Sequence, residues 1–158
     1  MSDPPLDFTL NGTPVRRRDV PDDELLLDTL RWRLAARGTK EGCRTGGCGA
    51  CTVLADGRTV LSCLTLTHEI AGRKVVTIEG LADDPVGRKV RAAFERELAL
   101  QCGYCTPGFV VALTGAIKSR PKDLDESALL DDLGGNLCRC TGYNAIRRAV
   151  HSLATERR

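Results

Sequence analysis

Hydrophobic and polar residues alternate in the first eighty or so positions in a way that is typical of short β-strands. Leu6, Phe8 and Leu10 alternate with polar residues, and Asn11-Gly12, a strong hairpin-turn signal, follows them. A second signal of this kind, Asp56-Gly57, separates two further short segments. The pattern therefore predicts a hairpin around Asn11-Gly12 and strands over 52–55, 58–61 and 74–78.

One helix is predicted within this first half of the chain. Asp22 or Asp23 can cap its beginning, and Gly38 can end it. Leucines at four-residue spacing lie on one face of this helix, at Leu26, Leu30 and Leu34. A hairpin, a helix and further strands together indicate a small α+β domain.

From Asp84 onward, the spacing of apolar residues becomes that of helices, and four short helices predict a small bundle. Asp84 can cap the first helix, and Pro85 can occupy its first position. The second helix begins at Thr106-Pro107 and must end before Pro121. The apolar face of the first helix comprises Val86, Val90, Phe94 and Leu98, and that of the second comprises Phe109, Leu113 and Ile117. The third helix starts at Asp125 and runs to Gly134-Gly135. The fourth, capped by Thr141, has Ile146, Ala149, Val150 and Leu153.

Composition and charge narrow the possible classes of protein. Hydrophobic residues make up 42% and charged residues 28% of 158 residues, which is ordinary for a globular protein. A net charge of +2 gives no argument for binding to nucleic acid or to an anionic membrane. No apolar stretch approaches the ~18–20 residues of a membrane helix, and the first ten residues do not have the pattern of a signal peptide. We therefore expect a cytoplasmic protein.

Eight cysteines in a cytoplasmic chain need a chemical explanation. Disulfides are rare in that compartment because thiols are kept reduced there. Buried free cysteines account for one or two positions, but not for eight cysteines in two tight groups. Ligation of a metal or of a metal cluster is the remaining common reason.

The first group of cysteines has the spacing of plant-type [2Fe–2S] ferredoxins, which is C-x4-C-x2-C with one distant cysteine. Its members are Cys43, Cys48, Cys51 and Cys63. Glycines within the loop suit a cluster, because they bring backbone N–H groups close to the sulfur atoms. A structural zinc site is the alternative, although zinc sites usually combine two separate short motifs.

The second group precedes the second and fourth predicted helices and comprises Cys102, Cys105, Cys138 and Cys140. Two helix N-termini can bring these thiolates around one centre, where the positive ends of the helices face an anionic cluster. Taken alone, the pattern also suits zinc, and a lone C-x-x-C suits a redox dithiol. His68 and His151 lie in no cysteine–histidine motif, and we interpret them as structural or surface residues.

Taken together, these segments resemble the small iron–sulfur subunit of the molybdenum hydroxylases, which is the family of xanthine oxidase and carbon monoxide dehydrogenase. The resemblance runs from Phe8 to about Leu153. It depends on G-T-K-E-G-C at 38–43, C-G-A-C-T-V at 48–53, T-I-E-G-L at 77–81, Q-C-G-Y-C-T-P-G at 101–108 and G-N-L-C-R-C-T-G-Y at 135–143.

The resemblance implies a β-grasp ferredoxin-like domain over 1–82 and a four-helix domain over 83–158, each with one [2Fe–2S] cluster. It implies that the cluster facing a flavin is ligated by Cys43, Cys48, Cys51 and Cys63. It implies that the cluster next to the molybdenum cofactor is ligated by Cys102, Cys105, Cys138 and Cys140.

The resemblance also assigns roles to single residues near the second cluster. Gln101 matches the position that hydrogen-bonds the pterin, and Cys140 lies on the side that approaches the pterin. Phe109 departs from the family pattern, because many relatives have methionine there. Since phenylalanine is also apolar, we expect altered packing and no change in the chemistry.

The function implied by the resemblance is electron transfer. Electrons would pass from the molybdopterin centre on a large subunit through the two [2Fe–2S] clusters to FAD on a medium subunit, within a dimer of heterotrimers. No catalytic residue is expected on this chain, which has no acid–base pair, no activated nucleophile and no nucleotide-binding loop. Two alternatives stay open, namely a stand-alone [2Fe–2S] ferredoxin and a zinc-binding interaction protein.

Overall fold

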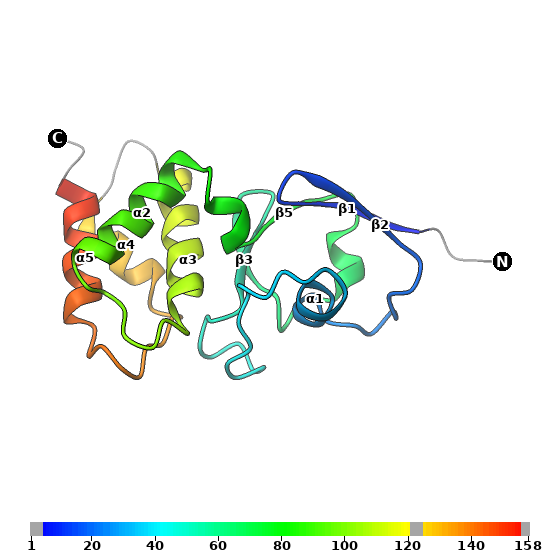
Figure 1. The fold of residues 1–158 in the computed structure, drawn as a ribbon, viewed down its shortest axis with the longest axis horizontal. Helices are drawn as coiled ribbons and strands as arrows, with labels where there is room; N and C mark the ends of the chain where they lie inside the picture. The colour runs from blue at the N-terminus through cyan, green and yellow to red at the C-terminus, as the bar shows by residue number, and fades with distance from the viewer. Residues whose placement is uncertain (1–4, 121–124, 156–158) are drawn as a thin grey trace.

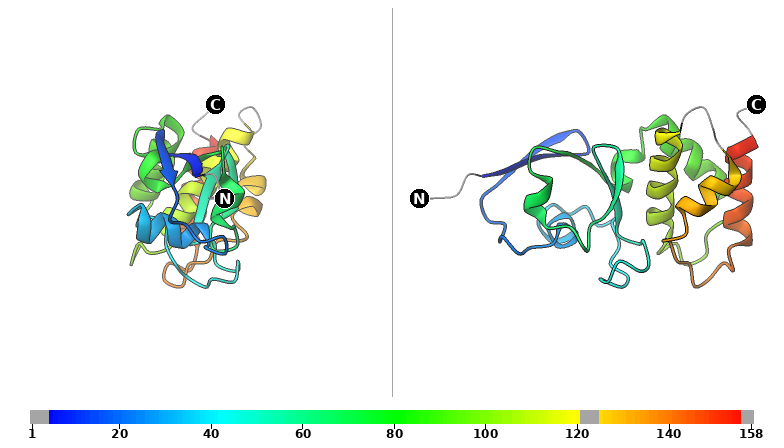
Figure 2. Two further views of the ribbon diagram at one scale, coloured as in Figure 1. Left: turned by 90° about the vertical axis from the view of Figure 1, so that its right-hand side faces the viewer. Right: turned by 180° about the vertical axis from the view of Figure 1, so that it is seen from behind.

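The computed structural model describes residues 5–120 and 125–155. A β-sheet half and a helical half lie end to end, and the chain passes from one to the other through β5 and the segment after it (Figures 1 and 2). This arrangement confirms the predicted α+β class with a ferredoxin-like part followed by a helical part. Within the described ranges, no helix is long and apolar enough to cross a membrane.

The sheet has five strands in the order β2-β1-β5-β3-β4. β1 and β5 are parallel, and the other neighbouring pairs are antiparallel. The strands are β1 (Leu6–Leu10), β2 (Thr13–Arg17), β3 (Thr52–Ala55), β4 (Arg58–Leu61) and β5 (Lys74–Val76).

Both predicted hairpin turns are present. Asn11 and Gly12 have φ values of 52° and 81°, and Asp56 and Gly57 have φ values of 49° and 81°. Two consecutive left-handed residues form the type I′ turn, whose twist matches that of the flanking strands. The turns join β1 to β2 and β3 to β4, so the sequence located both hairpins correctly.

The strand predicted over 74–78 is shorter in the structure. β5 ends at Val76, because the N–H of Thr77 donates to Asn11 Oδ1 at 2.9 Å and not to a neighbouring strand. The chain then forms the 3-10 turn η3 (Ile78–Leu81), in which the N–H of Gly80 donates to the carbonyl of Thr77.

The predicted helix of the first half is also shorter, and its caps differ from the prediction. It comprises α1 (Leu26–Asp28) and a π-helical turn, η1 (Thr29–Arg33), and it ends before Gly38. Neither Asp22 nor Asp23 caps it, because the first N–H groups donate to the carbonyls of residues 62 and 65. Leu26 and Leu30 are buried as predicted, whereas Leu34 lies beyond the helix and is half-buried. The 3-10 turn η2 (Thr67–Ile70) packs nearby.

The helical half has four α-helices within the described residues: α2 (Pro85–Arg96), α3 (Thr106–Ser119), α4 (Glu126–Asp132) and α5 (Asn144–Thr155). Asp84 caps α2 as predicted, because its carboxylate accepts from the N–H groups of Val86 and Gly87. Asp125 caps α4 in the same way. Pro121, where α3 was expected to stop, lies outside the described residues.

Two expectations about these helices were wrong. Leu98 does not join the apolar face of α2, because it has φ 52° beyond the end of the helix and is 77% exposed. Thr141 does not cap α5, which begins at Asn144. Its hydroxyl donates to Cys138 Sγ at 3.2 Å, so Thr141 belongs to a cysteine loop.

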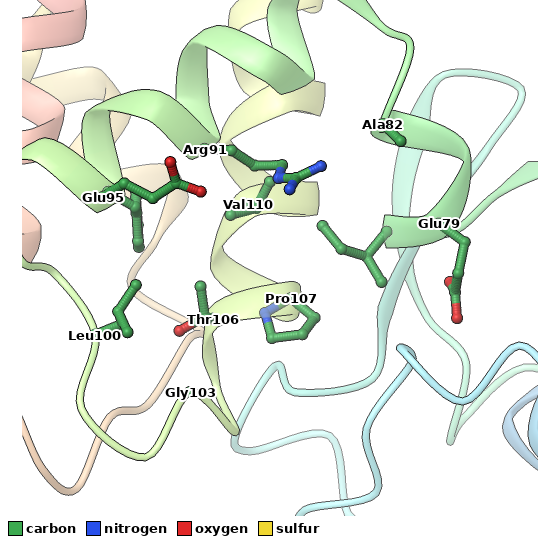
Figure 3. Close-up of a pocket in the computed structure, with 11 residues that line it drawn as sticks. Glu79, Ala82, Arg91, Glu95, Leu100, Gly103, Thr106, Pro107 and Val110 are labelled. Carbon is green, nitrogen blue, oxygen red and sulfur yellow. The ribbon is translucent and has the colours of Figure 1, made fainter.

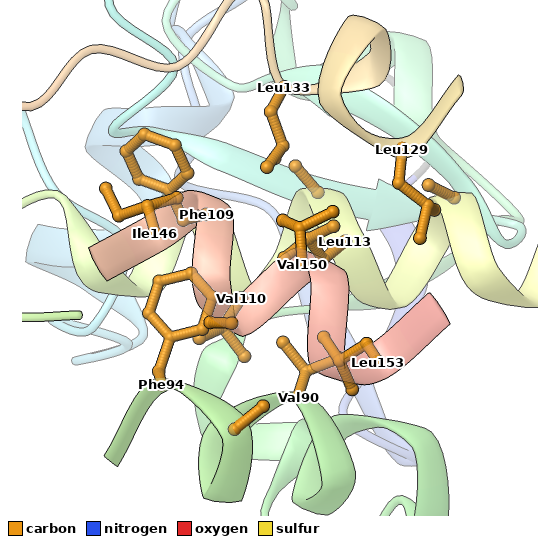
Figure 4. Packing of buried hydrophobic residues seen from close by; sticks show 14 of the residues in the cluster. Val90, Phe94, Phe109, Val110, Leu113, Leu129, Leu133, Ile146, Val150 and Leu153 are labelled. Carbon is orange, nitrogen blue, oxygen red and sulfur yellow. The ribbon is translucent and has the colours of Figure 1, made fainter. Parts of the chain in front are cut away.

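The core of the helical half is centred on α3, which is buried along almost its whole length (Figure 4). The ring of Phe109 lies between Phe94 and Tyr143, with centroid separations of 6.3 and 6.5 Å. Tyr143 in turn accepts a hydrogen bond from the N–H of Cys138. The unusual phenylalanine therefore packs against a side chain that supports a cysteine loop.

Replacement of Phe109 should show that this position contributes by packing. We expect Phe109→Met to change the free energy of unfolding by less than about 1.5 kcal/mol, because the two side chains have similar volumes. Phe109→Ala leaves a cavity and should cost about 3–5 kcal/mol. Denaturant unfolding compares the two variants, and the iron content of Phe109→Met should equal that of the unsubstituted protein. A methionine variant as unstable as the alanine variant would contradict this interpretation.

Candidate cysteine sites for two iron–sulfur clusters

The cysteine segments lie close to one another along one edge of the molecule. The loop before β3, the segment before α3 and the segment before α5 all reach the lower edge in Figure 1, and the view from behind in Figure 2 agrees. All eight cysteines are free thiols. The structure therefore gathers the two sequence groups on the same side of the junction between the two halves.

The first group forms two pairs of thiols. Cys43 and Cys48, in the loop before β3, interact through their side chains and are half-buried. Cys51, directly before β3, interacts with Cys63, which follows β4, and both of these side chains are buried. The β3–β4 hairpin brings the distant fourth cysteine to the loop, because its strands place the residues before and after it side by side.

The second group also forms two pairs, and each pair joins the two motifs. Cys140 Sγ lies 3.6 Å from Cys102 Sγ, and both side chains are exposed. Cys105, directly before α3, interacts with the buried Cys138. Because Cys102 and Cys105 each pair with a cysteine of the other motif, the arrangement is not that of a C-x-x-C redox dithiol.

Pairs of thiols fit the chemistry of a [2Fe–2S] cluster. In such a cluster four cysteines serve two irons, so that each iron takes two thiolates and the bridging sulfides complete its coordination. A structural zinc ion instead takes four ligands around one centre. Within the described residues, no three histidine, cysteine, aspartate or glutamate side chains gather closely enough to hold one ion.

The surroundings of the thiols favour the thiolate form at one cysteine in each group. Hydrogen bonds from Thr45 lower the pKa of Cys43 to about 6. Burial by itself raises the pKa of Cys138, but hydrogen bonds from the hydroxyl and N–H of Thr141 outweigh it and bring the pKa to about 7. Burial raises the pKa of Cys51 to about 11 and that of Cys105 to about 12. Donors to a sulfur atom also stabilise a thiolate that is bound to iron.

Direct hydrogen bonds join the two cysteine groups. The N–H of Leu137 donates to the carbonyl of Cys48 at 3.0 Å, and Asn136 Nδ2 donates to the carbonyl of Gly49 at 3.1 Å. Asn136 is 6% exposed, and Gly49 has φ 66°. No sequence pattern indicated this connection, although both sides of it lie within the motifs that carried the family resemblance.

The other candidate residues lie outside the thiol pairs. His68 Nε2 contacts the carbonyl of Val20, and His151 Nδ1 contacts Glu126 Oε2, which agrees with structural or surface roles. Gln101 is exposed next to Cys102. Its predicted contact with a pterin stays a prediction.

A mostly apolar pocket of about 410 Å³ lies between η3, α2 and the start of α3 (Figure 3). Phe94, Leu100, Pro107 and Val110 contribute apolar side chains to its wall. None of the eight cysteines lines this pocket. Gly103 and Thr106, which are next to Cys102 and Cys105 in the chain, do line it, so the pocket borders the second cysteine group.

Comparison with known proteins agrees with this geometry. A family model described as a 2Fe-2S iron-sulfur cluster binding domain matches residues 8–75, and a [2Fe-2S] binding domain matches residues 77–151. The nicotine 6-hydroxylase small subunit of Paenarthrobacter nicotinovorans is 45% identical over 92% of this chain and 86% of its own length. The isoquinoline 1-oxidoreductase subunit alpha of Brevundimonas diminuta is 41% identical over 96% and 98%.

A solved structure gives the same result. Quinoline 2-oxidoreductase from Pseudomonas putida 86 superposes with a TM-score of 0.85 at 35% sequence identity, covering 98% of this chain and 94% of that chain. The similarity to the sequence relatives and to the solved structure therefore extends over nearly the whole chain. The chain belongs to the family of small iron–sulfur subunits of the molybdenum hydroxylases.

Proposed function

We propose that the two cysteine groups hold two [2Fe–2S] clusters and that the chain carries electrons between partner subunits of a molybdenum hydroxylase. The paired thiols described above support this ligand assignment. The first cluster would be held by Cys43, Cys48, Cys51 and Cys63, and the second by Cys102, Cys105, Cys138 and Cys140. When bound, each [2Fe–2S] cluster supplies one-electron redox chemistry.

The observation that carries the proposal is the backbone hydrogen bond from Leu137 to Cys48. Leu137 directly precedes Cys138 in the chain, so one residue and one hydrogen bond connect a proposed ligand of the second group to a proposed ligand of the first. A continuous bonded connection of this kind suits a protein that must conduct electrons between two centres.

Exposure supports an orientation for the partner subunits. Cys102 and Cys140 are exposed, and Gln101 lies beside them, so we place the molybdopterin-binding large subunit against this group, with Gln101 toward the pterin. We place the FAD-binding medium subunit against the half-buried Cys43 and Cys48. The complete assembly would be a dimer of heterotrimers in the cytoplasm, where free thiols persist.

We also propose a domain boundary at residue 82. η3 ends at Leu81, and Asp84 begins the cap of α2, so the boundary falls between two elements. The proposed domains, 1–82 and 83–158, include residues 1–4, 121–124 and 156–158, which lie outside the described part of the chain.

Analysis of iron, acid-labile sulfide and zinc tests the proposal. We expect the chain, purified anaerobically with its partner subunits, to hold about four irons and four sulfides per copy and no zinc. Zinc without sulfide, from cells grown with sufficient iron, would replace the proposal by the zinc-binding alternative. About two irons would contradict the second cluster and return the helical half to an unassigned role.

A further inference from the structure

A second connection joins the two cysteine groups, and it uses a side chain. Tyr104 lies between Cys102 and Cys105 in the second group, yet its hydroxyl donates to the carbonyl of Glu41 at 2.6 Å. Glu41 lies two residues before Cys43, in the first group. The phenol ring therefore spans from the loop of one proposed cluster to the loop of the other.

The segment around Glu41 is also held from the sheet half of the molecule. The carboxylate of Glu41 accepts from Arg44 Nε at 2.8 Å, and Arg44 also pairs with Asp28 of α1. These contacts brace residues 41–44 against the sheet half of the molecule. Tyr104 holds the backbone of the same segment from the helical half, so that Cys43 lies between two anchors.

The two ends of the first cysteine loop are thus held by different partners. Leu137 and Asn136 contact the loop at Cys48 and Gly49, after the first thiol pair. Tyr104 contacts it at Glu41, before that pair. Among the hydrogen bonds within residues 5–120 and 125–155, that of Tyr104 is the one from the helical half that reaches the earlier end of the loop.

We propose that Tyr104, although it lies within the motif of the second group, is a positioning residue for the first group. The inference rests on the proposed function, because it assumes that each group holds a [2Fe–2S] cluster. Its hydrogen bond to the Glu41 carbonyl fixes the backbone that leads to Cys43, so it holds a ligand of a cluster in this loop in place. Tyr104 is anchored in the chain between two cysteines of the second group, and its hydroxyl contacts the loop of the first group.

The chain contains a matched control, because it has two tyrosines and each places its hydroxyl at a different group. The N–H of Cys138, in the second group, donates to the hydroxyl of Tyr143 at 2.8 Å. Tyr104→Phe and Tyr143→Phe thus remove the same atom from similar side chains. One deletion affects the loop of the first group, and the other affects the loop of the second group.

The test is an EPR-monitored redox titration of the complex with its partner subunits, with the two signals assigned by cysteine variants that lose one cluster. We expect Tyr104→Phe to shift the midpoint potential of the first cluster and to leave that of the second unchanged. We expect Tyr143→Phe to change only the midpoint potential of the second cluster. Iron release from the first cluster to a chelator should be about three- to tenfold faster in Tyr104→Phe, as follows from the loss of one hydrogen bond.

Two results would overturn the inference. One is a first-cluster potential and iron-release rate that Tyr104→Phe leaves unchanged. The other is a shift of the second cluster alone in that variant, which would show that Tyr104 serves the motif in which it lies. Failure of the proposed function is recognised separately, because the unsubstituted complex would then lack iron and sulfide.

Discussion

Replacement of Gly108 by alanine is expected to destabilise the junction between the two cysteine groups by about 3 kcal/mol. Gly108 lies in the first turn of α3, and a Cβ atom there would approach the carbonyl oxygen of Gly49 to 2.3 Å. The backbone at Gly108 and the backbone at Gly49 are both fixed by hydrogen bonds, so a shift of either one costs free energy. Relief of the contact requires the cysteine loop to move away from α3, which also strains the bonds from Leu137 and Asn136.

The measurement is thermal unfolding of the complex together with its iron content. Gly135→Ala is the matched control, because a Cβ at Gly135 would have no atom within 4 Å and the residue does not have a positive φ. We expect Gly108→Ala to lower the melting temperature by several degrees and to lose iron. We expect Gly135→Ala to keep the melting temperature and iron content of the unsubstituted protein. Equal melting temperatures and iron contents in the two variants would show that the cysteine loop can move away from α3 without a loss of stability.

Removal of one cysteine from each group should remove one cluster at a time. We expect Cys138→Ala and Cys51→Ala each to retain about two of about four irons, because an iron that loses one of its two thiolates no longer completes its coordination. The two variants should lose different EPR signals. Cys138 and Cys51 are both buried, so neither site is readily supplied with a replacement ligand from solvent.

Arg139→Ala provides the control for Cys138→Ala, because this exposed residue lies next to the same cysteine. Its iron content should equal that of the unsubstituted complex. A Cys138→Ala variant that keeps all its iron would remove Cys138 from the ligand set. Loss of all iron from either cysteine variant would mean that the two groups do not bind their clusters independently.

Sequence reasoning succeeded where the determining interactions are local. The Asn11-Gly12 and Asp56-Gly57 turns depend on the φ preferences of the residues themselves. The cap at Asp84 depends on contacts with the next three residues. The spacing of Cys43, Cys48 and Cys51 reflects the reach of one loop around a small cluster, so the spacing alone predicts a site there.

Sequence reasoning failed where distant backbone groups compete with local ones. A threonine before a helix usually caps it, but Thr141 donates to Cys138 Sγ, and sequence spacing does not distinguish these roles. Neither Asp22 nor Asp23 caps α1, because carbonyl groups some forty residues away accept from the first N–H groups of the helix. For the same reason, no local pattern indicates the bonds from Leu137 to Cys48 and from Tyr104 to Glu41, which form only when the two halves pack together.

The unequal burial of the thiols has a consequence for how the protein matures. Cys51 and Cys63 are each 2% exposed and flank the β3–β4 hairpin, whereas Cys102 and Cys140 are open to solvent. A cluster donor can reach the exposed pair after the chain has folded. The buried pair is enclosed once the hairpin has closed, so we expect iron to reach Cys51 and Cys63 before this part of the fold is complete.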